Sequence, residues 1–223
     1  MRTGKREYDH IIWDWNGTLL DDAWLCVEII NGVLGRRNLP AISMQQYQEK
    51  FGFPVRDYYE QLGFDFSLES FESIALDFIR EYGQRRHECR LHDASAGTLK
   101  RLAALQVSQS VLSAYHQASL EEMLDSFDLT GIFHKIFGLG DHYAHSKEER
   151  GLHLLQELGL PRDRILMVGD TIHDHEVAQA MGIDCILIPG GHQLRSRLES
   201  CGCPVPDSAA AILASVLSSS AAG

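Results

Sequence analysis

The feature that most constrains this chain is a short apolar run near its start that ends in an aspartate. Residues 11–22 read IIWDWNGTLLDD, and the run at 11–13 predicts a strand buried on both faces, as in a parallel sheet. Asn16 and Gly17 are turn formers and end that strand. Ligands of open α/β sheets bind beyond the carboxyl ends of the strands, so Asp14 is a candidate nucleophile or metal ligand. Taken alone, this stretch also fits an aspartate that only caps a turn.

Length and charge exclude several classes of partner. The chain has 223 residues, a formal net charge of −11 and a pI near 5.4. Such an acidic balance disfavours non-specific binding to nucleic acid or to an anionic membrane, both of which select basic patches. It leaves room for a small phosphorylated metabolite, because a local group of cations can lie inside an acidic protein. We expect a monomer or a homodimer that acts on such a metabolite, with no nucleic-acid or membrane partner.

The N-terminal and cysteine patterns predict a cytoplasmic protein. No apolar stretch approaches the roughly 20 residues that a membrane span needs. The basic N-terminus leads into only a short apolar run, which is not the pattern of a signal peptide. The five cysteines are odd in number and their spacings match no zinc pattern, so we expect reduced thiols.

The order of the periodic segments predicts two parts. Between residues 21 and 89 the apolar patterns have helical spacing, and no stretch reads as a good strand. From about residue 95 helices alternate with strand-length apolar runs, which implies βαβ units and a parallel sheet covered by helices. The predicted fold class is α/β, with a Rossmann-like parallel sheet core (1–20 and 90–223) and a helical cap (21–89) inserted after the first strand. Further core strands are expected at residues 108–112, 135–138, 165–168 and 185–188.

Polar residues follow the predicted strands at one edge of the sheet. Ser113 and Asp170 each follow a core strand, and Asp174 lies one helical turn beyond Asp170. Clustered carboxylates repel one another unless a cation lies among them, and oxygen-only ligands suit Mg²⁺. Lys147 adds a fixed positive charge and Ser113 a hydroxyl donor, so the group can hold a phosphoryl group. Taken singly, each residue also fits a plain structural role, such as a turn, a helix cap or a solvated lysine.

In this order the residues resemble the haloacid dehalogenase superfamily over nearly the whole chain. That family's first motif, D-x-D-x-T, corresponds to DWNGT at 14–18, and its fourth, GDTxxD, to GDTIHD at 169–174. Ser113 and Lys147 stand where the second and third motifs are expected. The helical insert after the first motif is similar to the subgroup with a small helical cap, and within it to the phosphoglycolate phosphatase branch.

The resemblance implies a Mg²⁺-dependent phosphatase that works through an aspartyl-phosphate intermediate on Asp14. It implies that Mg²⁺ binds Asp14, the backbone carbonyl of Asn16, and Asp170, with Asp174 assisting. Arg56 lies in a cap loop, residues 51–57, that contributes specificity in relatives, although a solvent-exposed arginine is the plainer alternative. The implied catalytic residues are Asp14, Asn16 and Lys147, and the implied substrate-binding residues are Thr18, Ser113, Ala114 and Arg56.

One departure from the family motif concerns the proton for the leaving group. The family's phosphatases carry a second aspartate two residues after the nucleophile as general acid and base, and this chain has Asn16. An amide cannot exchange that proton near neutral pH. The protein is then a slow phosphatase, uses another proton donor, or catalyses another reaction of the superfamily. Candidate donors are His173, His175, His142, His145 and Asp21.

Two alternatives to a phosphatase stay open. Phosphonate C–P hydrolases of the superfamily also lack the second aspartate, but they have alanine there and a cap lysine that forms a Schiff base. Lys50 is the only lysine of this cap, and it lies in a polar helix where a solvated role is simpler. A catalytically weakened protein that binds a phosphorylated metabolite for regulation also accounts for Asn16, although the retained Asp14 and Lys147 argue against complete loss of turnover.

Overall fold

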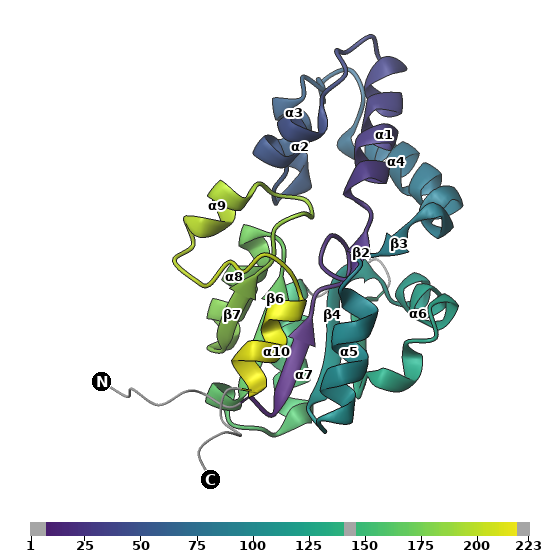
Figure 1. Ribbon diagram of the computed structural model, residues 1–223. Helices are drawn as coiled ribbons and strands as arrows, with labels where there is room; N and C mark the ends of the chain where they lie inside the picture. Colours follow the sequence, from purple (N-terminus) through teal and green to yellow (C-terminus); the bar gives the residue numbers. More distant parts are fainter. Residues whose placement is uncertain (1–7, 141–145, 218–223) are drawn as a thin grey trace.

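A parallel sheet of five strands forms the centre of the molecule (Figure 1). The computed structural model describes residues 8–140 and 146–217. The strands are β1 (His10–Trp13), β4 (Ser108–His116), β5 (Lys135–Leu139), β6 (Ile165–Gly169) and β7 (Asp184–Leu187). Their order is β5–β4–β1–β6–β7, so the first strand lies in the middle and the chain extends the sheet to one side and then to the other. The predicted Rossmann-like parallel sheet is confirmed.

Both faces of this sheet are covered by helices. Ile11 and Trp13 of β1 point into one apolar core shared with α5 (Ser95–Ala104) and α10 (Ala210–Leu217), and Ile12 points into a second core shared with α7 (Lys147–Leu158) and α8 (Ile172–Met181). In the described part of the chain, no helix is both long and apolar enough to cross a membrane. The core helices are α5 (Ser95–Ala104), α6 (Gln117–Ser126), α7 (Lys147–Leu158), α8 (Ile172–Met181), α9 (Arg195–Glu199) and α10 (Ala210–Leu217), with 3-10 turns η1 (Arg86–Glu88), η2 (Thr130–Ile132) and η3 (Arg162–Arg164).

The cap is a helical layer beyond the carboxyl edge of the sheet (Figure 1). Its helices are α1 (Ala23–Gly35), α2 (Met44–Lys50), α3 (Val55–Gln61) and α4 (Phe71–Arg85). Two short antiparallel strands, β2 (Leu20–Asp21) and β3 (Arg90–Leu91), carry the chain into and out of it. Within the cap, Arg37 bonds Glu69 at 2.6 Å and Asp77 at 2.9 Å, which ties the end of α1 to α4.

The cap contacts the core at a second place, between α2 and the segment around α9. Arg197 donates to the carbonyls of Gln48 and Phe51 at 3.0 and 2.7 Å. Gln193 also donates to the Phe51 carbonyl, at 2.9 Å. The C-terminal end of α2 is therefore held by core side chains, and the cap is closed over the edge of the sheet.

The structure corrects several predicted boundaries. The region predicted as helical without strands begins in β2, a ribbon too short to show a period in the sequence. Helix α4 starts at Phe71, because the Ser70 hydroxyl accepts a backbone N–H of its first turn at 3.2 Å. Strand β4 continues past the expected end at 112 to His116, with an irregular register against β5. Helix α9 was not predicted.

Candidate active site

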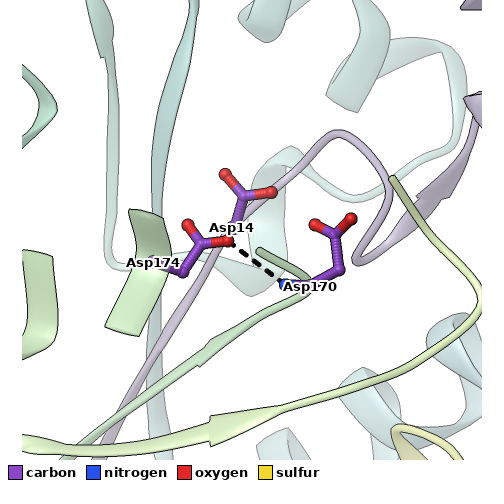
Figure 2. A group of neighbouring side chains, drawn as sticks. All are labelled: Asp14, Asp170 and Asp174. Atoms are coloured by element: carbon purple, nitrogen blue, oxygen red, sulfur yellow. Dashed lines mark hydrogen bonds between the residues drawn. The ribbon is translucent and has the colours of Figure 1, made fainter. Parts of the chain in front are cut away.

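Three carboxylates meet beyond the carboxyl ends of β1 and β6. Asp14 follows β1 directly, Asp170 follows β6, and Asp174 lies in the first turn of α8. Each offers an oxygen, and these oxygens all lie within 4.8 Å of one another (Figure 2). The residues belong together because parallel strands end at one edge and β6 leads straight into α8. We call Asp14, Asp170 and Asp174 the carboxylate cluster.

Lys147 is the cation of this cluster among the described residues. It begins α7, where Ser146 and Glu149 form a reciprocal capping box that fixes the start of the helix. Its Nζ donates to Asp14 Oδ1 and to Asp174 Oδ1, both at 2.5 Å. Because the lysine is 5 % exposed, the alternative of a solvated surface lysine is wrong.

Asp174 has two roles that the sequence offered as alternatives. Its Oδ2 accepts the backbone N–H of Thr171 at 3.0 Å and the Thr171 hydroxyl at 2.6 Å, which closes the N-terminus of α8. Its other oxygen binds Lys147. The same side chain therefore caps the helix and belongs to the cluster.

The charges of the cluster are not balanced by the protein. Burial raises the pKa of Asp14 to about 7, although Lys147 opposes the shift. Burial raises the pKa of Asp170 to about 6, although His192 opposes it. Burial also acts on Asp174, but there Lys147 outweighs it and the pKa is lowered. Three buried carboxylates facing one lysine, with oxygen as the only donor type, fit a hard divalent cation such as Mg²⁺.

The predicted phosphoryl-binding hydroxyls have different hydrogen-bond partners. Thr18 donates to Asp170 Oδ1 at 2.9 Å and is 3.3 Å from Asp14 Oδ2, so it is part of the constellation. Ser113 is buried in β4, and its hydroxyl accepts the backbone N–H of Tyr115 at 3.1 Å. Ala114 follows it and is exposed. The phosphoryl-binding roles of these residues stay predictions.

Several predicted residues are not brought to the cluster. The Arg56 guanidinium is half-exposed, lies 3.6 Å from Glu60 and stacks 4.7 Å over the ring of Phe66, so it faces the cap surface. His173 packs on Phe53 with ring centroids 4.6 Å apart, and His175 lines a pocket beside β7. Asp21 is in β2, and His142 and His145 lie outside the described residues.

Asn16 is engaged with a different carboxylate. Its side-chain amide donates to Asp22 Oδ2 at 2.7 Å and to the Tyr82 hydroxyl at 2.8 Å. Tyr82, from α4, donates to the same Asp22 oxygen at 2.6 Å, and the Gly17 N–H donates to the other at 2.8 Å. The amide is thus a link between core and cap, and it does not replace the missing acid.

His192 completes this second group from the loop between β7 and α9. Its Nε2 lies 3.4 Å from Asp22 Oδ1, its Nδ1 lies 2.9 Å from the Tyr47 hydroxyl of α2, and its backbone N–H donates to Asp170 Oδ2 at 2.7 Å. Burial acts to lower the pKa of His192, but Asp22 outweighs it and raises the pKa to about 9. Burial likewise acts to raise the pKa of Asp22, but His192 outweighs it and lowers that pKa. We call Asn16, Gly17, Asp22, Tyr82 and His192 the hinge network.

The sequence patterns did not indicate most of this network. Asp22 was visible as an acid after the first motif, but Tyr82 and His192 lie in segments without any recognisable motif. The one available signal was the pair of glycines before His192. A side chain on Gly191 would overlap Asp170 and the Gly17 carbonyl, so this loop has to pass close to the site.

A parallel sheet, a carboxylate cluster at its carboxyl edge and a cap over that edge define a class of hydrolases. The sequence profile of the haloacid dehalogenase-like hydrolase family matches residues 11–188, and the chain belongs to this family. The predicted superfamily and its hydrolase character are confirmed.

The relatives of the chain carry several different activities. A 5'-nucleotidase of Pseudomonas aeruginosa is 26% identical over 193 residues, 83% of this chain and 85% of that protein. A phosphoglycolate phosphatase of Pseudomonas syringae pv. tomato is 26% identical over 191 residues, 82% of this chain and 70% of that protein. The crystal structure of a predicted phosphatase from Clostridium acetobutylicum covers 95% of this chain and 99% of its own with a TM-score of 0.80 at 21% identity, which shows the shared fold.

Proposed function

We propose that the protein is a Mg²⁺-dependent phosphatase that hydrolyses the monoester of a small phosphorylated metabolite, of the phosphoglycolate phosphatase type. The observation that supports this most is the buried Asp14, held by Lys147 beside two further carboxylates. A carboxylate fixed at a strand end, with a cation beside it, can attack phosphorus while the neighbouring charges receive the phosphoryl oxygens. The names of the two Pseudomonas relatives agree with a phosphomonoester substrate.

In the proposed mechanism Asp14 forms an aspartyl phosphate, and water then cleaves it. Lys147 and Thr18, which contact Asp14, would orient the phosphoryl oxygens, with Ser113 as a further hydroxyl. Mg²⁺, held by Asp14, Asp170 and the Asn16 carbonyl with help from Asp174, would neutralise the charge of the phosphoryl group. The cap excludes water while it is closed.

Protonation of the leaving group is the step for which this chain lacks the family's usual aspartate. The Asn16 amide is committed to Asp22 and Tyr82, and neither His173 nor His175 contacts the carboxylate cluster among the described contacts. We therefore expect turnover to depend steeply on the pKa of the leaving group. An aryl ester such as p-nitrophenyl phosphate should react faster than an alkyl phosphate, because its leaving group needs little protonation.

The test is turnover of a panel of aryl and alkyl phosphates with Mg²⁺ and with EDTA, in wild type and Asp14→Asn. We expect Mg²⁺-dependent release of phosphate that Asp14→Asn lowers by ~10⁴-fold or more, with the fold retained by circular dichroism. Beryllium fluoride, a mimic of the aspartyl phosphate, should stabilise the wild-type protein against thermal unfolding and should not stabilise the variant. Phosphate label on Ser113 or a histidine would overturn the assignment of Asp14.

The same panel, with a phosphonate added, distinguishes the alternatives. Release of phosphate from a phosphonate, abolished by Lys50→Arg, would support a C–P hydrolase. In the described residues Lys50 makes no hydrogen bond or ion pair with the carboxylate cluster. Saturable binding of phosphate esters without turnover would support a regulatory protein.

A further inference from the structure

Three thiols lie near one another at the open edge of the sheet. Cys185 is a buried residue of β7, and Cys201 and Cys203 follow α9. The Leu187 N–H donates to the Pro204 carbonyl at 3.0 Å, which brings the segment after α9 alongside β7. Cys201 and Cys203 pack partly buried against the apolar core that contains Cys185.

The thiol of Cys203 is the accessible member of a contacting pair. A surface pocket of about 480 Å³ is lined by both Cys185 and Cys203, so small molecules can reach the pair from solvent. The Cys185 thiol lies beside the Cys203 sulfur, and the backbone N–H groups of Leu187 and Cys203 are near that sulfur. These donors stabilise a thiolate.

The two sulfurs have opposite acid–base properties as a result. The hydrogen bond from Cys185 lowers the pKa of Cys203 to about 7, against the effect of burial. The pKa of Cys185 is raised, first because it donates to Cys203 and then because of its burial. Burial raises the pKa of Cys201 as well. Near neutral pH, Cys203 is therefore the thiol that reacts first with an electrophile.

We propose that Cys203 and Cys185 form a peroxide-sensitive pair that closes to a reversible disulfide. The Cys203 thiolate attacks one oxygen of a hydroperoxide, the O–O bond breaks, and the sulfur becomes a sulfenic acid while the alkoxide leaves and takes a proton. The Cys185 sulfur then attacks the sulfenic sulfur, an S–S bond forms, and water leaves with the Cys185 proton. In total two thiols and one hydroperoxide give one disulfide, one water and one alcohol.

Cys185 is suited to the second step because its proton is held by Cys203 only while that sulfur is an anion. Once Cys203 is a neutral sulfenic acid, the largest cause of the raised Cys185 pKa is gone. The disulfide would close a ring over residues 185–203. That ring contains His192, Gln193 and Arg197, the core side chains that hold α2 of the cap, so oxidation would stiffen the segment that keeps the cap closed.

The test uses the full chain, reduced, freed of reductant and exposed to hydrogen peroxide before alkylation and tryptic mass spectrometry. Cleavage at arginine gives one peptide, residues 165–195, with Cys185 and a second, residues 198–223, with both Cys201 and Cys203. We expect these two peptides to become cross-linked and to separate again with dithiothreitol. Cys201→Ser should keep the cross-link, and Cys203→Ser should lose it.

Cys89→Ser is the matched control, because burial raises the pKa of that thiol and it lies outside the group; it should leave the cross-link unchanged. A bond within the 198–223 peptide, or a cross-link that survives Cys203→Ser and is lost in Cys201→Ser, would overturn the pairing. Sulfinic acid on Cys203 without any cross-link would overturn the role of Cys185.

Discussion

Asp14 and Asp22 lie on either side of one turn, both buried, and yet they are in opposite electrostatic states. Asp22 is surrounded by partners of its own: an amide, a phenol, a backbone N–H and an imidazole. Asp14 shares a single lysine with another carboxylate and has a third beside it. Burial acts to raise the pKa of both carboxyls, but the partners of Asp22 outweigh it and lower that pKa, whereas the pKa of Asp14 stays raised. A buried charge that has all its hydrogen-bonding and ionic partners stabilises the fold. A buried charge that lacks partners indicates a site for a ligand or a metal ion.

The largest expected difference between the two groups is in stability. Asp22→Ala should lower the unfolding free energy by roughly 3–5 kcal/mol, because the charge of His192 and the hydroxyl of Tyr82 lose their buried partner. Asp170→Ala should cost at most about half as much without metal, because it also removes repulsion inside the cluster. Urea unfolding at pH 7 in EDTA measures both. Equal losses in the two variants would contradict the comparison.

The contributions of Asp14 and Asp22 to stability should also depend on pH with opposite signs. The folded pKa of Asp14 is about 7, above its ordinary value, so its stabilising contribution is complete at low pH and is lost as pH rises toward 7. The folded pKa of Asp22 is lowered, so its contribution is present at neutral pH and is lost on acidification. We therefore expect metal-free wild type to lose on the order of 2–4 kcal/mol relative to Asp14→Asn between pH 4 and pH 8. Urea unfolding of both proteins across this range checks it, and parallel curves would refute it.

Metal should stabilise one group and leave the other unaffected. At a Mg²⁺ concentration about 100 times its dissociation constant, wild type should gain about 2.7 kcal/mol. Calorimetric titration and thermal melting should show this gain lost in Asp170→Ala and kept in Tyr82→Phe, which removes a hinge hydroxyl without touching the cluster. A gain of equal size in Asp170→Ala would exclude Asp170 as a ligand.

The carboxylate cluster and the hinge network also differ in how well the sequence predicts them. Asp14 and Asp170 could be predicted because each directly follows a strand, and strand ends of a parallel sheet meet. Asp174 lies in the first turn of the helix after β6, and Lys147 begins the helix after β5. The sheet itself could be predicted from apolar runs of strand length. These signals are local in the chain.

The hinge network could not be predicted in that way. His192 and Tyr82 reach Asp22 only because the cap folds back onto the core, and neither lies in a segment with a period or motif that indicates the contact. Arg56 has a loop position that indicated the site, while its side chain lies beside Glu60 on the cap surface, in agreement with the solvent-exposed alternative. Contacts between the two parts depend on side-chain directions that periodicity does not contain.

The smallest expected change in stability comes from Asn16→Asp. The new carboxylate would face Asp22 Oδ2 across the present 2.7 Å contact, so a hydrogen bond becomes a repulsion. We expect a loss of about 1–3 kcal/mol near pH 7.5, smaller near pH 5, where a proton shared by the two carboxylates restores the bond. Urea unfolding at the two pH values tests this, and a loss that does not depend on pH would count against it.

The reciprocal exchange, Asn16→Asp with Asp22→Asn, decides whether this contact or the missing acid limits catalysis. An amide at position 22 can donate to a carboxylate at position 16, so the hydrogen bond is kept with its direction reversed, and a carboxylate now stands two residues after Asp14. If the acid is what the site lacks, kcat for alkyl phosphates should rise by up to ~10²–10⁴-fold, and kcat for p-nitrophenyl phosphate much less. Asp22→Asn alone is the matched control, because it makes the same change at the hinge without adding an acid. A double variant that is more stable than Asn16→Asp but no faster on alkyl phosphates would mean that another group already delivers the proton.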